Sequence, residues 1–214
     1  MEPIMFRPTC LSFLLIIGFV TTAWAEKNSL LEPKITTLGS PVITETYESP
    51  LAAPFTGVKG TWNVIDGILV GKELAADKHA AVLNLQEKNR DSVIRFSFQL
   101  GGDTTGFNLS MNHASGHLFR IVVTPSAMSI NLDKNKKDAA SKTVVMATAK
   151  GKFEQGKWYT MQVEMRGDRV VAQTDNGLIV EASNPTLDVD KPNYRFVMKG
   201  DSLSIDDLQI WEVK

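Results

Sequence analysis

Residues 156–182, GKWYTMQVEMRGDRVVAQTDNGLIVEA, decide the fold class of this 214-residue chain. From Tyr159 to Arg166, apolar and polar side chains alternate strictly. This pattern indicates a half-buried β-strand, because successive side chains of a strand leave opposite faces. Gly167-Asp168 interrupts the run, and Asp175-Asn176-Gly177 supplies residues that tolerate positive φ at a tight turn. The stretch therefore predicts three antiparallel strands with one apolar and one polar face.

The same alternation recurs on both sides of this stretch. It is seen in residues 93–100, 107–112, 128–132 and 194–198, and Asp66-Gly67 between two short apolar runs suits a two-residue hairpin turn. The sequence contains no convincing amphipathic helix. We therefore predict an all-β fold of two packed antiparallel sheets, in the manner of a sandwich or jelly roll.

The first 25 residues have the pattern of an export signal. Arg7 precedes an apolar run of about ten residues, the length of a signal-peptide core and too short to cross a bilayer, and Ala23-Trp24-Ala25 matches a cleavage site. We expect residues 1–25 to be a cleaved signal peptide, with no transmembrane segment in the mature chain. The protein would then be periplasmic, cell-surface or extracellular. Residues 26–54 have little periodicity and predict a linker or N-terminal arm before a domain at 55–214.

Cysteine content indicates how the mature chain is stabilised, and net charge indicates which partners it disfavours. Cys10 is the only cysteine and lies in the expected signal, so the mature chain would hold together by burial without disulfides. The formal net charge of −1 argues against nucleic acid or an anionic membrane as a general partner.

The C-terminal residues predict a local irregularity. Leu203 and Ile205 share one parity, whereas Leu208 and Ile210 share the other, so the phase slips at Asp206-Asp207. A regular strand would expose one of the apolar pairs, which would forgo roughly 3–6 kcal/mol of burial. We therefore predict a β-bulge at Asp206-Asp207 that buries both pairs and turns at least one aspartate outward.

Three fragments together resemble a known family. They are GTWNVIDGILVGKE (60–73), GKWYTMQVEMRGDRVVAQTDN (156–176) and SLSIDDLQIWEV (202–213). Over residues 55–214 the chain resembles the concanavalin A-like jelly rolls of exported bacterial proteins. Within that group it is most similar to laminin-G-like domains and to the 3-keto-disaccharide hydrolase domain family. The resemblance implies a glycan-related role at or outside the cell envelope, with carbohydrate as the partner.

One departure from that fold group limits the functional inference. Its glucanases carry E-x-D-x-x-E on one strand, which sets two carboxyl groups about 5 Å apart for retaining hydrolysis. This chain has no such motif. Three hypotheses stay open: a glycan-binding module that is non-catalytic or weakly catalytic, a hydrolase or lyase that cleaves 3-keto or related glycosides, and a structural or adhesive envelope protein.

Polar residues at outward positions are the candidate ligand contacts. Amide, guanidinium and carboxylate groups match the hydroxyls of sugars. If their strands are neighbours, these residues would line the exposed concave face on which related lectins and glucanases hold sugars; the alternative is an ordinary solvated sheet face. The candidates are Arg95, Gln99, Asn108, Asn112, Arg120, Gln162 and Glu164.

The candidate catalytic residues are Glu164, His113, His117 and Arg120. Cleavage next to a keto group needs one base and a polarising cation rather than two carboxylates. His117 shares the parity of apolar Phe119, so the alternative for it is a structural, hydrogen-bonded histidine. Three histidines without a carboxylate cluster argue against a zinc site.

The resemblance also implies a structural calcium, for which Asp206 and Asp207 are the candidate ligands because calcium favours carboxylate and backbone oxygens. The alternative is a bulge whose aspartate bonds to neighbouring backbone amides. No other cofactor is expected.

Overall fold

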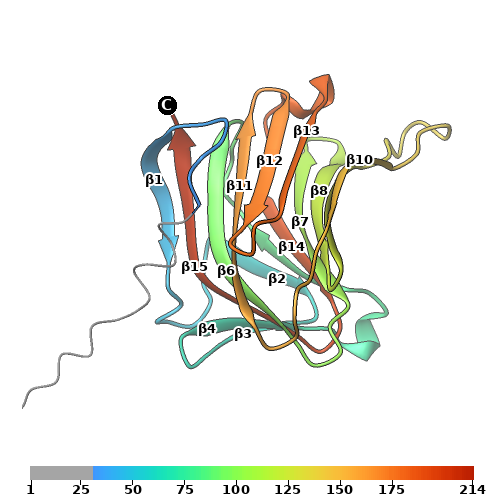
Figure 1. The fold of residues 1–214 in the computed structure, drawn as a ribbon. Coiled ribbons are helices and arrows are strands. Elements are labelled where there is room, and N and C mark those ends of the chain that lie inside the picture. The colour runs from blue at the N-terminus through green and yellow to red at the C-terminus, as the bar shows by residue number, and fades with distance from the viewer. Residues whose placement is uncertain (1–30) are drawn as a thin grey trace, which may run out of the picture.

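The computed structural model describes residues 31–214, which form two antiparallel sheets packed face to face (Figure 1). The predicted signal peptide, residues 1–25, lies outside the described residues. Sheet A has the order β13-β12-β11-β6-β15-β4-β3, with β1 also paired to β15. Sheet B has the order β10-β9-β8-β7-β14-β5-β2. The predicted all-β, two-sheet antiparallel sandwich is confirmed.

Both sheets are built mainly from short strands. Sheet A contains β1 (Leu38–Glu45), β3 (Thr61–Ile65), β4 (Ile68–Lys72), β6 (Ser92–Gly101), β11 (Trp158–Arg166), β12 (Arg169–Thr174), β13 (Ile179–Ser183) and β15 (Ser202–Val213). Sheet B contains β2 (Phe55–Lys59), β5 (Ala81–Leu85), β7 (Gly106–His113), β8 (Gly116–Thr124), β9 (Ala127–Leu132), β10 (Val144–Lys150) and β14 (Tyr194–Lys199). Two single-turn 3₁₀ helices, η2 (Ala75–Asp77) and η3 (Pro185–Leu187), lie in the connections.

The core lies between the sheets and is built by the alternation seen in the sequence. On β6, Phe96 and Phe98 point inward and are fully buried. Phe96 packs edge-on against Phe196 of sheet B, with ring centroids 5.2 Å apart, and Phe98 packs against Phe107 at 4.8 Å. Tilted and edge-to-face ring pairs of this kind stabilise a core beyond their buried area.

The predicted hairpin and the predicted bulge are both present. Asp66 and Gly67 have φ of 51° and 75°, as a type I′ turn requires at both central positions. In β15 the register against β6 shifts between Asp206 and Gln209, and Asp207 takes a φ of 50°. The bulge lies where β15 exchanges one neighbour for another: it pairs with β4 up to Ile205 and with β1 from Leu208 onward.

The bulge has the expected effect on the burial of the neighbouring side chains. All four apolar side chains of the slipped pairs are buried, and both aspartates are partly exposed. Asp206 Oδ1 accepts a hydrogen bond of 2.8 Å from the Asp207 amide, which anchors the extra residue locally.

The N-terminal residues are more firmly held than a linker. β1 is an edge strand on β15, with register shifts on both sides of Pro41. Residues 31–37, called here the N-terminal strap, bond to side chains on the outer face of sheet A, as described below. The strap attaches mainly through backbone amides and carbonyls, so no apolar periodicity marks it in the sequence.

None of the helices in residues 31–214 is long and apolar enough to cross a membrane.

Candidate functional site

The seven predicted ligand residues divide between the two sheets. The sequence gives the parity of a strand but not the sheet to which it belongs, and consecutive strands β6 and β7 lie in different sheets. The residues therefore face opposite sides of the sandwich and cannot form one surface. Arg95, Gln99, Gln162 and Glu164 belong to sheet A, and Asn108, Asn112 and Arg120 belong to sheet B.

The N-terminal strap covers Glu164. This side chain is completely buried. Its carboxylate accepts hydrogen bonds from the backbone amides of Lys34 at 2.8 and 2.9 Å, Ile35 at 2.9 Å and Thr36 at 3.1 Å, and from the Thr36 hydroxyl at 2.8 Å. Its acceptor capacity is thus taken up by the chain itself, and the structure assigns it an anchoring contact.

The other polar groups of sheet A also serve the strap. Arg95 Nη2 donates to the Leu31 carbonyl at 2.9 Å and Arg95 Nε donates to Gln162 Oε1 at 2.9 Å, while Gln173 Nε2 donates to the Glu32 carbonyl at 2.7 Å. Burial lowers the pKa of Arg95, against the opposing charges of Glu32 and Glu164. Gln99 lies apart from this group and donates to the Gly156 carbonyl at 2.8 Å.

On sheet B, five outward polar residues stand in register across five strands. Direct cross-strand pairing joins each to the next, which puts neighbouring Cβ atoms about 4.5–5.5 Å apart. We call this set the central polar row: Asn84 (β5), Arg195 (β14), Ser110 (β7), Arg120 (β8) and Asn131 (β9).

Three atoms of the central polar row are buried without a hydrogen-bond partner in the described part of the chain. They are Asn84 Oδ1, Arg195 Nε and Asn131 Oδ1. An unpaired buried donor or acceptor costs about 1–3 kcal/mol, and native proteins keep few of them. Three in a single row give this face hydrogen-bonding capacity that the protein itself does not use.

The two arginines of the row differ in their partners. Arg120 forms an ion pair with Asp133, whose side chain is only 4 % exposed. Arg195 has no ion pair with any acid in residues 31–214. Burial and the charge of Arg120 lower the pKa of Arg195. Positive charge on this face is therefore incompletely balanced.

A hydrogen-bonded chain orients His117 beside the row. Asn112 Nδ2 donates to Asn193 Oδ1 at 3.0 Å, which leaves Asn112 Oδ1 as the acceptor for His117 Nδ1 at 2.9 Å. The proton of a neutral imidazole is thereby placed on Nδ1, and Nε2 is left as a base. Burial, followed by the charges of Arg195 and Lys136, lowers the pKa of His117.

The position of His117 differs from the parity expectation. A register shift between Met111 and Asn112 pairs Asn112 with His117, so His117 joins the polar face and is only partly buried. His113 lies nearby at the end of β7, where its Nδ1 bonds to the Ser115 hydroxyl at 2.9 Å. Of the four candidate catalytic residues, His113, His117 and Arg120 are on sheet B, and Glu164 is on the opposite side.

A pocket of about 450 Å³ opens beside His117 and Asp133. Its lining continues the polar face toward the loop after β9. The lining residues are His113, His117, Leu118, Leu132, Asp133, Asn135, Ser141, Thr186 and Val189.

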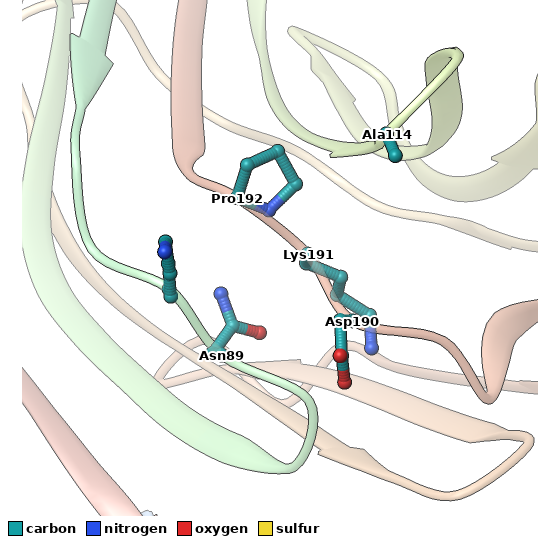
Figure 2. A pocket seen from close by; sticks show the side chains of 6 residues that line it. Asn89, Ala114, Asp190, Lys191 and Pro192 are labelled. Carbon is teal, nitrogen blue, oxygen red and sulfur yellow. The ribbon is translucent and has the colours of Figure 1, made fainter.

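A second pocket, of about 410 Å³, lies between the segment after β5 and the segment before β14 (Figure 2). Lys191 lines it, but its Nζ donates to the carbonyls of Arg90 at 2.7 Å and Val189 at 3.0 Å. This buried amine holds the two segments together, which gives it a structural role.

The described part of the chain shows no grouping of side-chain ligands at the candidate calcium site, Asp206 and Asp207, beyond the two aspartates themselves. Within residues 31–214, no three His, Cys, Asp or Glu side chains are grouped so as to hold a metal ion. Asp206 and Asp207 stand together in the bulge, with one oxygen of Asp206 bonded to the Asp207 amide. His79 is exposed in the loop before β5.

Four of the five members of the central polar row were not among the predicted site residues, and one of them, Ser110, has the same outward parity as the candidates Asn108 and Asn112. Arg195 lies between the inward-facing Tyr194 and Phe196, and Asn131 has the same outward parity as Ser129. The alternation could therefore have identified both residues. Asn84 lies outside the runs of alternation that were identified in the sequence. Only the pairing of β5, β14, β7, β8 and β9 brings them together.

Comparison with known families and structures gives one family match. The model of the 3-keto-alpha-glucoside-1,2-lyase-like domain matches residues 51–205, which is more than half of the chain. A comparison with curated proteins finds no match.

Solved structures share the fold at low sequence identity. The carbohydrate-binding module CBM66 from Bacillus subtilis is 16% identical, with a TM-score of 0.53 over 74% of this chain and 92% of that chain. The laminarinase from Rhodothermus marinus is 10% identical, with a TM-score of 0.62 over 85% of this chain and 100% of that chain. SCLam, a non-specific endo-beta-1,3(4)-glucanase from family GH16, is 13% identical, with a TM-score of 0.60 over 86% of this chain and 95% of that chain.

Proposed function

The chain belongs to the 3-keto-alpha-glucoside-1,2-lyase-like domain family, and on that premise we propose that it is an exported protein that binds a saccharide on the outer face of sheet B. The observation that carries the proposal is the set of three unpartnered buried atoms in the central polar row. These three side chains are partly exposed as whole residues, so a small rotation would bring the covered atoms to the surface, where sugar hydroxyls, which both donate and accept, could bond to two amide oxygens and a guanidinium N–H. Export rests on the signal-like pattern of residues 1–25.

We favour sheet B over sheet A as the binding face because the polar side chains of the two faces differ in whether they already have hydrogen-bond partners. On sheet A, the N-terminal strap satisfies Arg95 and Glu164. On sheet B, no described segment takes up the free atoms of the row. The carbohydrate-binding module and the glucanases that share the fold support a saccharide as ligand.

Asn131→Leu tests the binding face. Leucine is close in size to asparagine but cannot hydrogen-bond, so saccharide affinity should fall. The melting temperature should stay level or rise, because a buried acceptor without a partner is removed. Asn63→Leu, at an exposed position on β3 of sheet A, is the matched control.

The measurement is calorimetric titration of the three proteins with the best ligands from a panel of β-glucan, fructan, xylan and uronate oligosaccharides. Weaker binding by Asn131→Leu alone, with no loss of melting temperature, supports the proposal. Equal affinities for all three folded proteins, or no binding by the wild type to any member, would contradict it.

A second candidate function is cleavage of a 3-keto-glycoside, and the orientation of His117 favours it. The 3-keto group acidifies the proton on C2, which His117 Nε2 would accept. The C1–C2 double bond then forms as the C1–O bond breaks, and the leaving oxygen takes the electron pair. Arg120 and Arg195 would stabilise the negative charge that develops on the keto oxygen.

Turnover of a 3-keto-glucoside by the wild type and by His117→Gln tests this candidate. A loss of at least about 100-fold in the variant is expected for removal of a general base. Equal rates for the two proteins would remove His117 from the chemistry, and no turnover by the wild type would leave binding as the function.

A further inference from the structure

Two arginines flank a small residue at the centre of the polar row. Arg195 of β14 and Arg120 of β8 are both direct cross-strand partners of Ser110. Ser110 is short and 5% exposed, so it adds little between the two long side chains. Both arginines therefore start from positions that flank Ser110 on the outer face of sheet B, and the charge of Arg120 acts on Arg195.

The charge at this place is unbalanced. Asp133 neutralises Arg120, whereas Arg195 has no acid partner in the described part of the chain and its Nε is buried without a hydrogen bond. Lys136, in the loop after β9, adds positive charge close enough to His117 to lower the pKa of that residue. An anion placed over Ser110 would meet the net positive field of an arginine that has no acid partner in the described part of the chain.

We propose that the saccharide bound on this face is acidic and that Arg195 binds the carboxylate of a uronic acid residue above Ser110. This inference rests on the proposed binding function. A guanidinium presents its donors in a planar fork that matches a carboxylate, and such charge-assisted bonds are about twice as strong as neutral ones. A sulfate ester carries the same charge but is tetrahedral, and the experiment below separates the two.

The rest of the row fits the neutral parts of such a ligand. Asn84 and Asn131 stand four strand spacings apart, roughly 19 Å at the usual spacing in a sheet. Each keeps an unpartnered carbonyl oxygen that can accept from a sugar hydroxyl. The row is therefore long enough for an oligosaccharide, with Arg195 and Arg120 between its ends.

The test compares each acidic sugar with its own neutral form. Tetrasaccharides of galacturonate, mannuronate and glucuronate are titrated against the wild type as free acids and as methyl esters, with a sulfated galactan tetrasaccharide as the third arm. At least one free acid should bind about tenfold or more tightly than its ester, which corresponds to about 1.4 kcal/mol. The preference should shrink in high salt, since mobile ions screen exposed charges.

Variants link the preference to Arg195. Arg195→Gln should abolish the ratio of acid to ester affinity, and Arg195→Lys should restore part of it because the charge returns without the planar fork. Arg169→Gln, at a half-exposed arginine paired with Glu181 on sheet A, is the matched control and should keep the wild-type ratio. Thermal melts verify that each variant is folded.

Three results would overturn the inference. Equal binding of acid and ester by the wild type refutes the acidic ligand and leaves the saccharide-binding face standing. Tighter, Arg195-dependent binding of the sulfated sugar refutes the carboxylate. Failure of every saccharide to bind refutes both this inference and the proposed function.

Discussion

Replacing Glu164 with glutamine should release the N-terminal strap from sheet A. The change keeps the shape of the side chain but turns one acceptor oxygen into a donor. Oε1 accepts from the Lys34 amide and from Gln162 Nε2, whereas Oε2 accepts from the amides of Lys34, Ile35 and Thr36 and from the Thr36 hydroxyl. An amide nitrogen at either position faces donors that it cannot satisfy.

The magnitude follows from the number of bonds lost. At least two hydrogen bonds to a charged group are lost, at about 1.5–3 kcal/mol each, which gives about 3–6 kcal/mol. Because residues 31–37 belong to no strand, we expect the strap to detach before the sandwich unfolds, and the loss of global stability is then limited to the free energy that strap docking contributes. Local opening is therefore the more sensitive readout.

Hydrogen exchange at the amides of residues 34–36, together with urea denaturation, measures both effects. Glu181→Gln is the control, since Glu181 is half-exposed and paired with Arg169, and surface pairs contribute about 1 kcal/mol or less. We expect fast exchange at 34–36 only in Glu164→Gln. Slow exchange there, with stability equal to that of Glu181→Gln, would refute the anchoring role of Glu164.

Two further changes address buried groups. Tyr194→Phe should cost about 1 kcal/mol, because it removes a 2.7 Å bond to Ser92 Oγ, whereas Tyr47→Phe should cost nothing, because that hydroxyl has no described partner. Burial raises the pKa of both tyrosines above 10, so wild-type stability should fall as the pH rises above 10, where the unfolded chain ionises first. Each variant should show a smaller fall in the free energy of unfolding when denaturation is measured across this pH range. Asp206→Asn should raise the melting temperature at pH 7, because burial raises the pKa of Asp206, so that wild-type stability falls as pH rises above 3.8. A chelator-induced fall in the wild-type melting temperature that Asp206→Asn abolishes would instead mark calcium at the bulge.

The sequence predicted local structure well because local structure depends on neighbouring residues. Alternation located β6, β7, β9, β11 and β14 and the side of each that faces the core. The phase slip around Asp206-Asp207 predicted a bulge whose physical cause is the exchange of β4 for β1 beside β15. Asp66-Gly67 predicted the turn that its positive φ values require.

The site depends on which strands become neighbours, and the sequence does not encode that locally. Arg95 and Asn108 both have outward parity, yet β6 and β7 enter different sheets. A register shift carries His117 to the polar face against its parity. The N-terminal strap binds Glu164 mostly through backbone amides, which every residue except proline carries, so its side chains give no sign of it.

A nuclear magnetic resonance titration tests the central claim most directly. The ¹⁵N-labelled protein is titrated with laminaritetraose or a galacturonate tetrasaccharide, whichever binds more tightly, and shifts are followed for backbone amides and asparagine side chains. We predict that the largest shifts lie along β5, β14, β7, β8 and β9, and include the side-chain amides of Asn84 and Asn131. Saturable shifts confined to the outer face of sheet A or to the edges of the sandwich would contradict the assignment of the binding site to sheet B.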